Sequence, residues 1–549
     1  MFQYGGSFDL AAVSAVTKSS GAELFVGRAC CFLVPIAFGV LAVMLGQDAN
    51  WDLRNYHWYN PYALLTGRFT FDLAPGSYYN PVLDVPLYLL AQHVPARVCG
   101  FLLGAVQGLN FVPLYVLALT ILPQWARWKH GSGAAIVASL GVLGGGGLAL
   151  IGTTFYDNVV SILLLSGFAI VSRSMRNDDG VTNAALVWAG VLTGAAIGMK
   201  LPTAIYGVGL LVAVFTIEGQ IVQRLGRAFR SGSAALVAML AFGGYWAWWL
   251  WSTFGNPIFP YFNNVFRSSM ALSATYRDDR FVPHTFLDAL LLPLTLVADP
   301  TKVGECYFTD VRLATLYVVS LVGVVWIFFG KRWSSIRRPE PLSPALRFVL
   351  VAAAFSYLAW LALFGIYRYI ITLEMLAPLL IAALIATWPI REPGRLVLVV
   401  ACASMLAIST RPGSWGRVEW GQRFVEVDVP LLRDPSHTMV LMVGFEPSSW
   451  VIPSFPREVP FVRLQGNSHS PADGDVGLAR EARMRVAKHQ GYFELLYAQS
   501  EQTLAREVLG RFELSADFDS CRPVGGNLNS GLRLCPVRRV TTVLSMRRG

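Results

Sequence analysis

The chain has 549 residues, of which 54% are hydrophobic and only 14% are charged, and its formal net charge is +10. A soluble domain carries about 25% charged residues, so this composition excludes an ordinary soluble protein and indicates a polytopic membrane protein. Lys and Arg lie in short clusters between apolar runs instead of along one aromatic-lined face, which argues against nucleic-acid binding.

Apolar runs long enough to cross a bilayer recur up to residue 409. A span needs about 20 mostly apolar residues, and this rule predicts about eleven transmembrane helices. They are expected at 29–46, 98–122, 133–151, 156–172, 183–199, 201–217, 233–252, 312–329, 346–365, 369–388 and 395–409. The shorter run at 82–93 contains prolines and is expected to be an interfacial or re-entrant segment.

The basic residues indicate how the chain is oriented. No small-residue cleavage site follows the first apolar run, which is therefore expected to stay as an anchor. Basic residues occupy alternate connections, as the positive-inside bias requires, so the N-terminus is predicted to be cytoplasmic. These residues are Lys18, Arg28, Arg127, Lys129, Arg173, Arg176, Arg224, Arg227, Arg230, the stretch from Lys331 to Arg347, Arg391 and Arg395.

Two long connections lie on the opposite, outer face in this topology. They are a first outer loop at 47–97 and a second at 253–311, both rich in aromatic residues and prolines. Ordered loops of this length are usually functional, so the site is expected on this face. The second loop suits either a lid over a lipid-facing cavity or a segment that only packs on the bilayer.

Composition changes after residue 409. Residues 410–549 contain a strand-like run, HTMVLMVGF, and a helical pattern through ARMRVAKHQGYFELLYAQSEQTLAREVL. We therefore expect a transmembrane domain at 1–409 and an extracytoplasmic α/β domain at 410–549. Cys521 and Cys535 can form a disulfide if this tail lies outside the cytoplasm.

The first outer loop opens with the stretch QDANWDLRNYHWYNPY at 47–62. If this stretch is helical, the four-residue spacing puts the carboxylates of Asp48 and Asp52 on one face, close enough to share a ligand. Acids can also simply mark the exit of a helix into water. Two acids followed by further polar side chains favour a site, and those side chains are Arg54, Asn55, Tyr56 and His57.

This stretch and its continuation, GRFTFDLAPGSYYNPVLDVP, resemble the GT-C superfamily of integral membrane glycosyltransferases. Its members include protein O-mannosyltransferases and bacterial lipid-linked mannosyl, arabinosyl and aminoarabinosyl transferases. The resemblance implies a sugar donor linked to a polyprenyl phosphate, a glycan, lipid or protein acceptor, and a bacterial inner membrane location with a periplasmic tail. It also implies an acidic base in the first outer loop, either Asp52 or Asp48, with Asp52 favoured by its DLRNYH context.

Displacing a lipid phosphate requires cations near the membrane surface. Arg368, Lys200 and Arg54 are predicted to bind the donor phosphate. Arg368 opens a span and can alternatively be a snorkelling side chain. Lys200 is an isolated basic residue in the outer-face turn between two spans. This position goes against the positive-inside trend, which favours a functional role.

Further polar and aromatic residues on the outer face are predicted to contact the substrate. They are His57, Tyr56, Asn55, Asp157, Asn158, Tyr369 and Glu374. Asp157 and Asn158 can instead cap the next helix. No cofactor is assigned; some members of the superfamily use a divalent ion with paired acids, so Asp48 with Asp52 leaves Mg²⁺ or Mn²⁺ open.

Two other functions compete with glycosyl transfer. A transporter or flippase of a lipid-linked sugar would be expected to show more charged residues within spans and a repeated pair of broken spans. A polymerase or ligase of lipid-linked polysaccharide would use basic and His residues of an outer loop in place of an acid.

Overall fold

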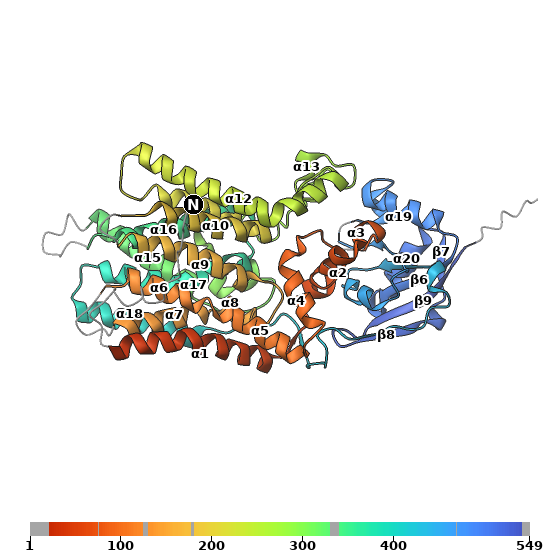
Figure 1. Ribbon diagram of the computed structural model, residues 1–549, viewed down its shortest axis with the longest axis horizontal. Helices are drawn as coiled ribbons and strands as arrows, with labels where there is room; N and C mark the ends of the chain where they lie inside the picture. The colour runs from red at the N-terminus through yellow and green to blue at the C-terminus, as the bar shows by residue number, and fades with distance from the viewer. Residues whose placement is uncertain are drawn as a thin grey trace, which may run out of the picture.

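The computed structural model describes residues 21–74, 76–123, 130–176, 180–329, 340–467 and 469–540. The molecule is elongated, with a helical bundle at one end and a domain built on a β-sheet at the other (Figure 1). Three short helices of the first outer loop lie between them: α2 (Tyr59–Thr66), α3 (Arg68–Phe71) and α4 (Asp84–Ala91). The first outer loop is therefore the layer that joins the two parts.

The bundle is formed by apolar helices of different lengths. They are α1 (Gly21–Leu45), α5 (Ala96–Gly108), α6 (Phe111–Ile121), α7 (His130–Val142), α8 (Gly145–Ala149), α9 (Asp157–Ser174), α10 (Asn183–Met199), α11 (Ala204–Val214), α12 (Ile221–Phe254), α15 (Arg312–Phe329), α16 (Pro344–Leu363), α17 (Ile371–Thr387) and α18 (Glu392–Ser409). In the described residues, 7 stretches are long and apolar enough to cross a membrane. Seven predicted spans coincide with these stretches and the other four with shorter apolar helices, so the multi-pass α-helical class is confirmed, while the count of eleven stays a prediction.

Three predicted segments differ from the observed helices. The expected span 133–151 is broken, because α7 ends at Val142 and the glycine-rich α8 follows. The expected span 233–252 is longer, since α12 begins at Ile221 and places the basic residues 224–230 in a helix instead of a connection. The second outer loop is not all irregular: it contains α13 (Asn263–Phe266) and α14 (Phe286–Ala298).

The pairing of α10 with α12 depends on three glycines spaced four residues apart. A Cβ added at Gly190, Gly194 or Gly198 would lie 2.2, 2.0 or 2.5 Å from a backbone carbonyl oxygen of α12. Small residues at this spacing allow two membrane helices to approach closely. Since α10 ends at Met199, the tight pairing also fixes the position of Lys200 at its C-terminus.

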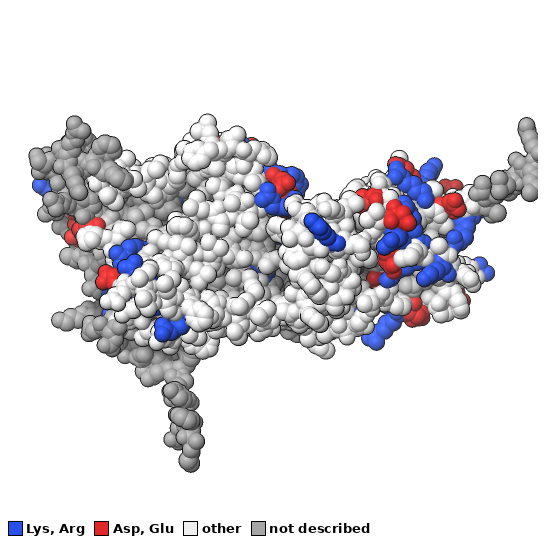
Figure 2. All heavy atoms as spheres, turned by 90° about the horizontal axis from the view of Figure 1, so that it is seen from above, with Lys and Arg blue, Asp and Glu red and all other residues white. Residues whose placement is uncertain are grey.

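Charged side chains gather over the tail domain and at the opposite end of the molecule, and the bundle surface between them is mostly white in Figure 2. This distribution is expected for a chain whose middle faces lipid. Part of the basic set behind the predicted orientation, namely Lys18, Arg127, Lys129 and 331–339, lies outside the described residues.

The tail domain is an α/β fold on a 7-stranded sheet. The strands are β3 (Val427–Asp428), β4 (Thr438–Val443), β5 (Phe461–Gln465), β6 (Tyr492–Ala498), β7 (Leu514–Ala516), β8 (Arg522–Gly526) and β9 (Leu532–Arg539). Their order is β3-β8-β9-β6-β4-β5, with β7 paired to β9. Strands β5 and β6 run parallel to β4 on its two sides. Helix α19 (Gly477–Lys488) connects β5 to β6, and α20 (Gln502–Gly510) connects β6 to β7.

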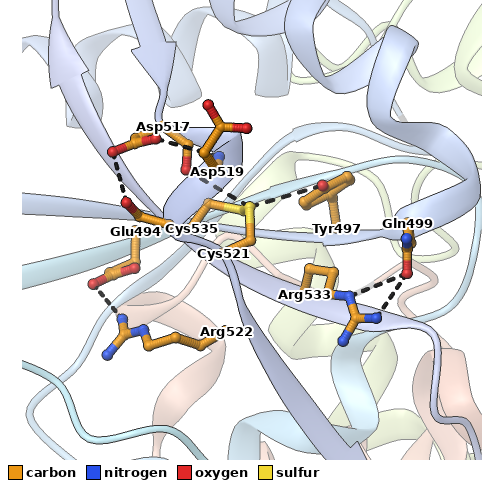
Figure 3. Close-up of a disulfide and its surroundings, with 10 residues drawn as sticks. Glu494, Tyr497, Gln499, Asp517, Asp519, Cys521, Arg522, Arg533 and Cys535 are labelled. Carbon is orange, nitrogen blue, oxygen red and sulfur yellow. Dashed lines mark hydrogen bonds and ion pairs between the residues drawn. A yellow bond between two sulfur atoms is a disulfide. The ribbon is translucent and has the colours of Figure 1, made fainter.

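A disulfide joins Cys521 to the buried Cys535 on β9, next to Tyr497 (Figure 3). The bond closes a loop with a sequence separation of 14. It connects the start of β8 to β9, which are also paired through backbone hydrogen bonds. The bond forms between the two cysteines that the sequence singled out.

Backbone pairing of the β type joins the first outer loop to the residues after 409 at two places in the described residues. Strand β1 (Gln47–Asp48) pairs antiparallel with β2 (Arg417–Val418). Leu73 forms a parallel bridge to β5, donating its N–H to Phe461 at 2.8 Å and accepting from Arg463 at 2.7 Å. One residue of the loop thus extends the sheet edge of the tail domain.

Candidate functional site

The turn that leaves α1 is built around Asp48. Gly46 follows the helix with a φ of 94°, in the left-handed region that favours glycine. The buried carboxylate of Asp48 accepts from Asn50 Nδ2 at 2.8 and 2.9 Å, and from the backbone N–H and hydroxyl of Thr154, both at 2.9 Å. Both oxygens of Asp48 are therefore bonded to neutral donors within the protein.

Asp52 lies on the next turn. The side-chain oxygen of Asn50 accepts the N–H of Leu53 at 2.7 Å and caps a single π-helical turn, Leu53–His57, which Asp52 immediately precedes. The expectation that Asp48 and Asp52 share one helical face is wrong, because α1 ends before Asp48 and that residue is extended in β1. Burial and the negative charge of Asp52 raise the pKa of Tyr56 well above its ordinary value.

Arg368 reaches Asp52 from the other side of the site. It lies in the short helix Tyr367–Ile370 before α17, and one guanidinium nitrogen is 3.2 Å from Asp52 Oδ2. The other side of the guanidinium donates to Glu305 at 2.6 and 3.3 Å. Its carbon lies 4.5 Å from the centre of the Phe155 ring. The guanidinium thus bridges two carboxylates over an aromatic face, and its side chain is 12% exposed.

Lys200 forms a second ion pair on the same face. Its ammonium lies 2.7 Å from Asp157 Oδ1 and donates to the carbonyl of Phe155 at 2.5 Å. Burial lowers the pKa of Lys200, and the negative charge of Asp157 offsets part of this effect. The other oxygen of Asp157 is buried and has no hydrogen-bond partner within the described residues. Tyr369 lies with its ring centre 5.8 Å from the Lys200 ammonium.

His57 pairs with an acid from α4. Its Nδ1 is 2.7 Å from Asp84 Oδ1, and its ring packs against Tyr56 and Tyr156 with centroids 4.4 and 5.5 Å apart. Burial raises the pKa of Asp84, while His57 and a hydrogen bond from Tyr156 lower it. The structure therefore brings Asp52, Arg368, Lys200, Asp157, His57, Tyr56 and Tyr369 into one cluster.

The remaining predicted residues point elsewhere. Glu374 accepts the N–H groups of Gly146 and Gly147 at 3.0 and 2.8 Å, in the interior of the bundle. Asn158 donates to the carbonyl of Gly147 at 2.9 Å. Both side chains fix the glycine-rich α8 instead of facing the cluster.

Two more predicted residues of the first outer loop also lie apart from the cluster. Arg54 forms an ion pair with Glu446 of the tail domain. Asn55 is buried against Gly76, where an added Cβ would lie 2.0 Å from its side-chain oxygen.

Three further residues contact the cluster and were not predicted as site residues. Glu305 and Tyr156 belong to no recognisable sequence motif, although Tyr156 directly precedes Asp157. Asp84 stands in the stretch that supports the GT-C resemblance, but nothing local to it indicates His57 as its partner. A buried cation requires a charge partner, so the sequence could have been searched for an acid to pair with each predicted cation.

Asp48 and Asp52, the two acids considered as a pair for a divalent ion, are both bonded to other protein groups. Asp48 has both oxygens bonded to Asn50 and Thr154, and Asp52 is paired with the guanidinium of Arg368. In the part of the chain that the structure describes, no three His, Cys, Asp or Glu side chains converge with metal-ligand geometry. Asp48 and Asp52 therefore do not form the pair of free carboxylates that the sequence left open for Mg²⁺ or Mn²⁺.

Comparison with known proteins finds no matching family profile and no similar curated protein. Two solved structures are similar. One is ArnT from Cupriavidus metallidurans bound to undecaprenyl phosphate, with 12% identity and a TM-score of 0.43, over 94% of this chain and 98% of that one. The other is the oligosaccharyltransferase of Archaeoglobus fulgidus in complex with Zn and sulfate, with 12% identity and a TM-score of 0.46, over 89% of this chain and 69% of that one. At this level of similarity, function has to be argued from the chain's own residues.

Proposed function

We propose that the protein is a membrane glycosyltransferase of the GT-C type that moves a sugar from a polyprenyl-phosphate donor to a glycan, lipid or protein acceptor. The observation that carries the proposal is the contact between Asp52 and Arg368 at the end of the apolar bundle, beside Lys200. This arrangement puts an acid next to two cations where a lipid phosphate would meet the end of a transmembrane bundle. Displacement of a phosphate by a hydroxyl requires both types of group.

In the proposed reaction, the acceptor hydroxyl attacks the anomeric carbon of the donor. Asp52 takes the hydroxyl proton, and the bond between the anomeric carbon and the phosphate oxygen breaks. The electron pair leaves with the lipid phosphate, whose charge Arg368 and Lys200 neutralise. Attack opposite the leaving group inverts the configuration. The unpartnered oxygen of Asp157 supports a role as a hydrogen-bond acceptor for a sugar hydroxyl.

The surroundings of the two acids support Asp52 as the base over Asp48. A base needs a lone pair that faces the substrate, and Asp48 has both oxygens occupied by protein donors. Asp52 is 8% exposed and bonded to a residue that we assign to the donor phosphate. When the donor phosphate binds Arg368, the guanidinium is shared between the phosphate and Asp52. A lone pair of Asp52 is then available to accept the proton of the acceptor hydroxyl.

We propose that the site and the tail domain lie on the periplasmic face of a bacterial inner membrane, with the N-terminus in the cytoplasm. The disulfide between Cys521 and Cys535 supports this side, because disulfides persist in oxidising compartments. The described basic residues at 224–230 lie at the start of α12, at the opposite end of that helix from the loop that reaches the cluster.

A transfer assay separates this function from transport and polymerisation. Purified protein in liposomes is given a radiolabelled polyprenyl-phosphate sugar and a hydroxyl acceptor, and the products are resolved. The proposal expects one labelled glycoside and free polyprenyl phosphate in equal amounts. Label that crosses the membrane still attached to lipid indicates a flippase, and a ladder of products indicates a polymerase.

As the pH rises, we expect the transfer rate to decline before the pH reaches the ordinary lysine pKa of about 10.4. Burial lowers the pKa of Lys200, so its charge is present below that lowered pKa and is lost as the pH rises through it. The neutral amine no longer binds the phosphate. The profile of kcat/KM for the donor against pH measures this limb. In Lys200→Arg the guanidinium stays charged, so the limb should move to higher pH; an unchanged limb contradicts the assignment.

A further inference from the structure

The strand order of the tail domain reverses direction at the carboxyl end of β4. From β4 the chain passes to β5, which pairs with one side of β4, and then to β6, which pairs with the other side. The loops that follow β4 and β6 therefore diverge at this end of the sheet. Open α/β sheets bind their ligands at such a switch point. Here the loop after β4 contacts the first outer loop of the transmembrane domain through an ion pair between Glu446 and Arg54.

The loop after β4 is fixed from behind. Glu501, which follows β6, accepts the backbone N–H groups of Phe445 at 2.8 Å and of Glu446 at 3.3 Å. Gly444 has a φ of 119°, and a Cβ there would lie 2.0 Å from a Glu501 oxygen, so only glycine leaves room for this contact. The loop therefore presents the Glu446 side chain in one direction.

The carboxylate of Glu446 makes two contacts. Asn529 donates to Oε1 at 2.7 Å, and the Arg54 guanidinium pairs with the same oxygen. Arg54 also donates through Nε to the carbonyl of Ala49 at 3.0 Å. The Arg54 side chain is 15% exposed and that of Glu446 is 33% exposed, so the pair is partly shielded from water.

We infer that Glu446 is a positioning residue that acts through Arg54 on Asp52. Arg54 lies two residues after Asp52 in the same turn. By holding the Arg54 guanidinium toward the tail domain, Glu446 fixes that turn and keeps a second cation away from Asp52, whose partner is then Arg368. The tail domain thus binds a segment of the first outer loop at the place where open α/β sheets bind ligands.

The kinetic consequence of this inference rests on the proposed function, but the structural consequence does not. The test compares Glu446→Ala, Arg54→Met and the charge-swapped pair Arg54→Glu with Glu446→Arg in the full-length protein. Glu507→Ala is the matched control, because it removes an exposed ion pair with Arg511 at 2.9 Å on α20. Amide hydrogen exchange of residues 47–58 is measured together with kcat and the donor KM.

We expect Glu446→Ala and Arg54→Met to raise exchange in residues 47–58 and to lower kcat by about 10- to 100-fold, since a displacement of about 1 Å at a reacting group has this order of effect. The donor KM should stay within about twofold, and the swapped pair should recover most of kcat. Increased donor KM in Arg54→Met with a silent Glu446→Ala would make Arg54 a phosphate ligand and overturn the inference. Unchanged exchange in both variants would also overturn it, even if no sugar transfer is detected in the native protein.

Discussion

Replacing Asp52 with Asn is expected to lower the rate of sugar transfer by about 10²- to 10⁴-fold, the usual contribution of a positioned general base. Asn has nearly the same shape as Asp but accepts no proton at neutral pH. The substitution also removes the charge attraction between Asp52 and Arg368, whose Oδ2 and Nη1 atoms are 3.2 Å apart in the native protein. The loss should fall on kcat, because donor binding depends mainly on the cations. The measurement is kcat from initial rates of glycoside formation at saturating donor.

Asp48→Asn is the matched control for this experiment. Its carboxylate accepts four hydrogen bonds from the side chain of Asn50 and from Thr154. An amide nitrogen in place of one oxygen faces these donors without accepting from them, so thermal stability should decrease. The rate per folded molecule should decrease much less than in Asp52→Asn. Full activity in Asp52→Asn, or a selective loss of kcat in a stable Asp48→Asn, would contradict the assignment of the base.

Replacing Arg368 with Met is expected to lower kcat/KM for the donor by about 10²- to 10³-fold, as the loss of an electrostatic group at a developing charge does. The change leaves Asp52 and Glu305 facing each other without the guanidinium that bridges them. It also removes the cation that lies 4.5 Å from the Phe155 ring centre. Initial rates over a range of donor concentrations separate the effect on KM from that on kcat.

Two further variants make the Arg368 experiment specific. Arg368→Lys keeps a charge but not the planar fork that contacts two carboxylates, so its activity should fall between those of the native protein and Arg368→Met. Arg280→Met changes an Arg of the second outer loop that is 74% exposed and paired with Asp278, and it should leave the rate within about twofold. An Arg368→Met enzyme with native donor kinetics would remove Arg368 from the site.

The sequence predicted the transmembrane part of the fold better than the details of the turn that carries the acids. Hydropathy located the helices because lipid-facing helices must be apolar along a whole span. Arg368 and Lys200 were selected as candidates because a cation is costly in such a setting and requires a partner. The pairing of α10 with α12 was not predicted, although the glycines at 190, 194 and 198 were a readable signal for it.

The expectation that Asp48 and Asp52 share one helical face was wrong for a local reason. A spacing of four implies one face only within a continuous helix, and Gly46 ends α1 before Asp48. Asn50, three residues before Leu53, was the available signal for a new cap. Glu446 and Glu305 could not be paired with Arg54 and Arg368 from the sequence, because 392 residues separate the first pair and 63 the second.

The most direct test of the central claim is an experimental structure of the protein with polyprenyl phosphate. We predict density for the phosphate about 3 Å from the guanidinium of Arg368 or the ammonium of Lys200, with Asp52 on the side open to the acceptor. A phosphate bound away from this cluster would contradict the account. One such place is the surface hollow of about 500 Å³ lined by Arg97, Arg417 and Trp420.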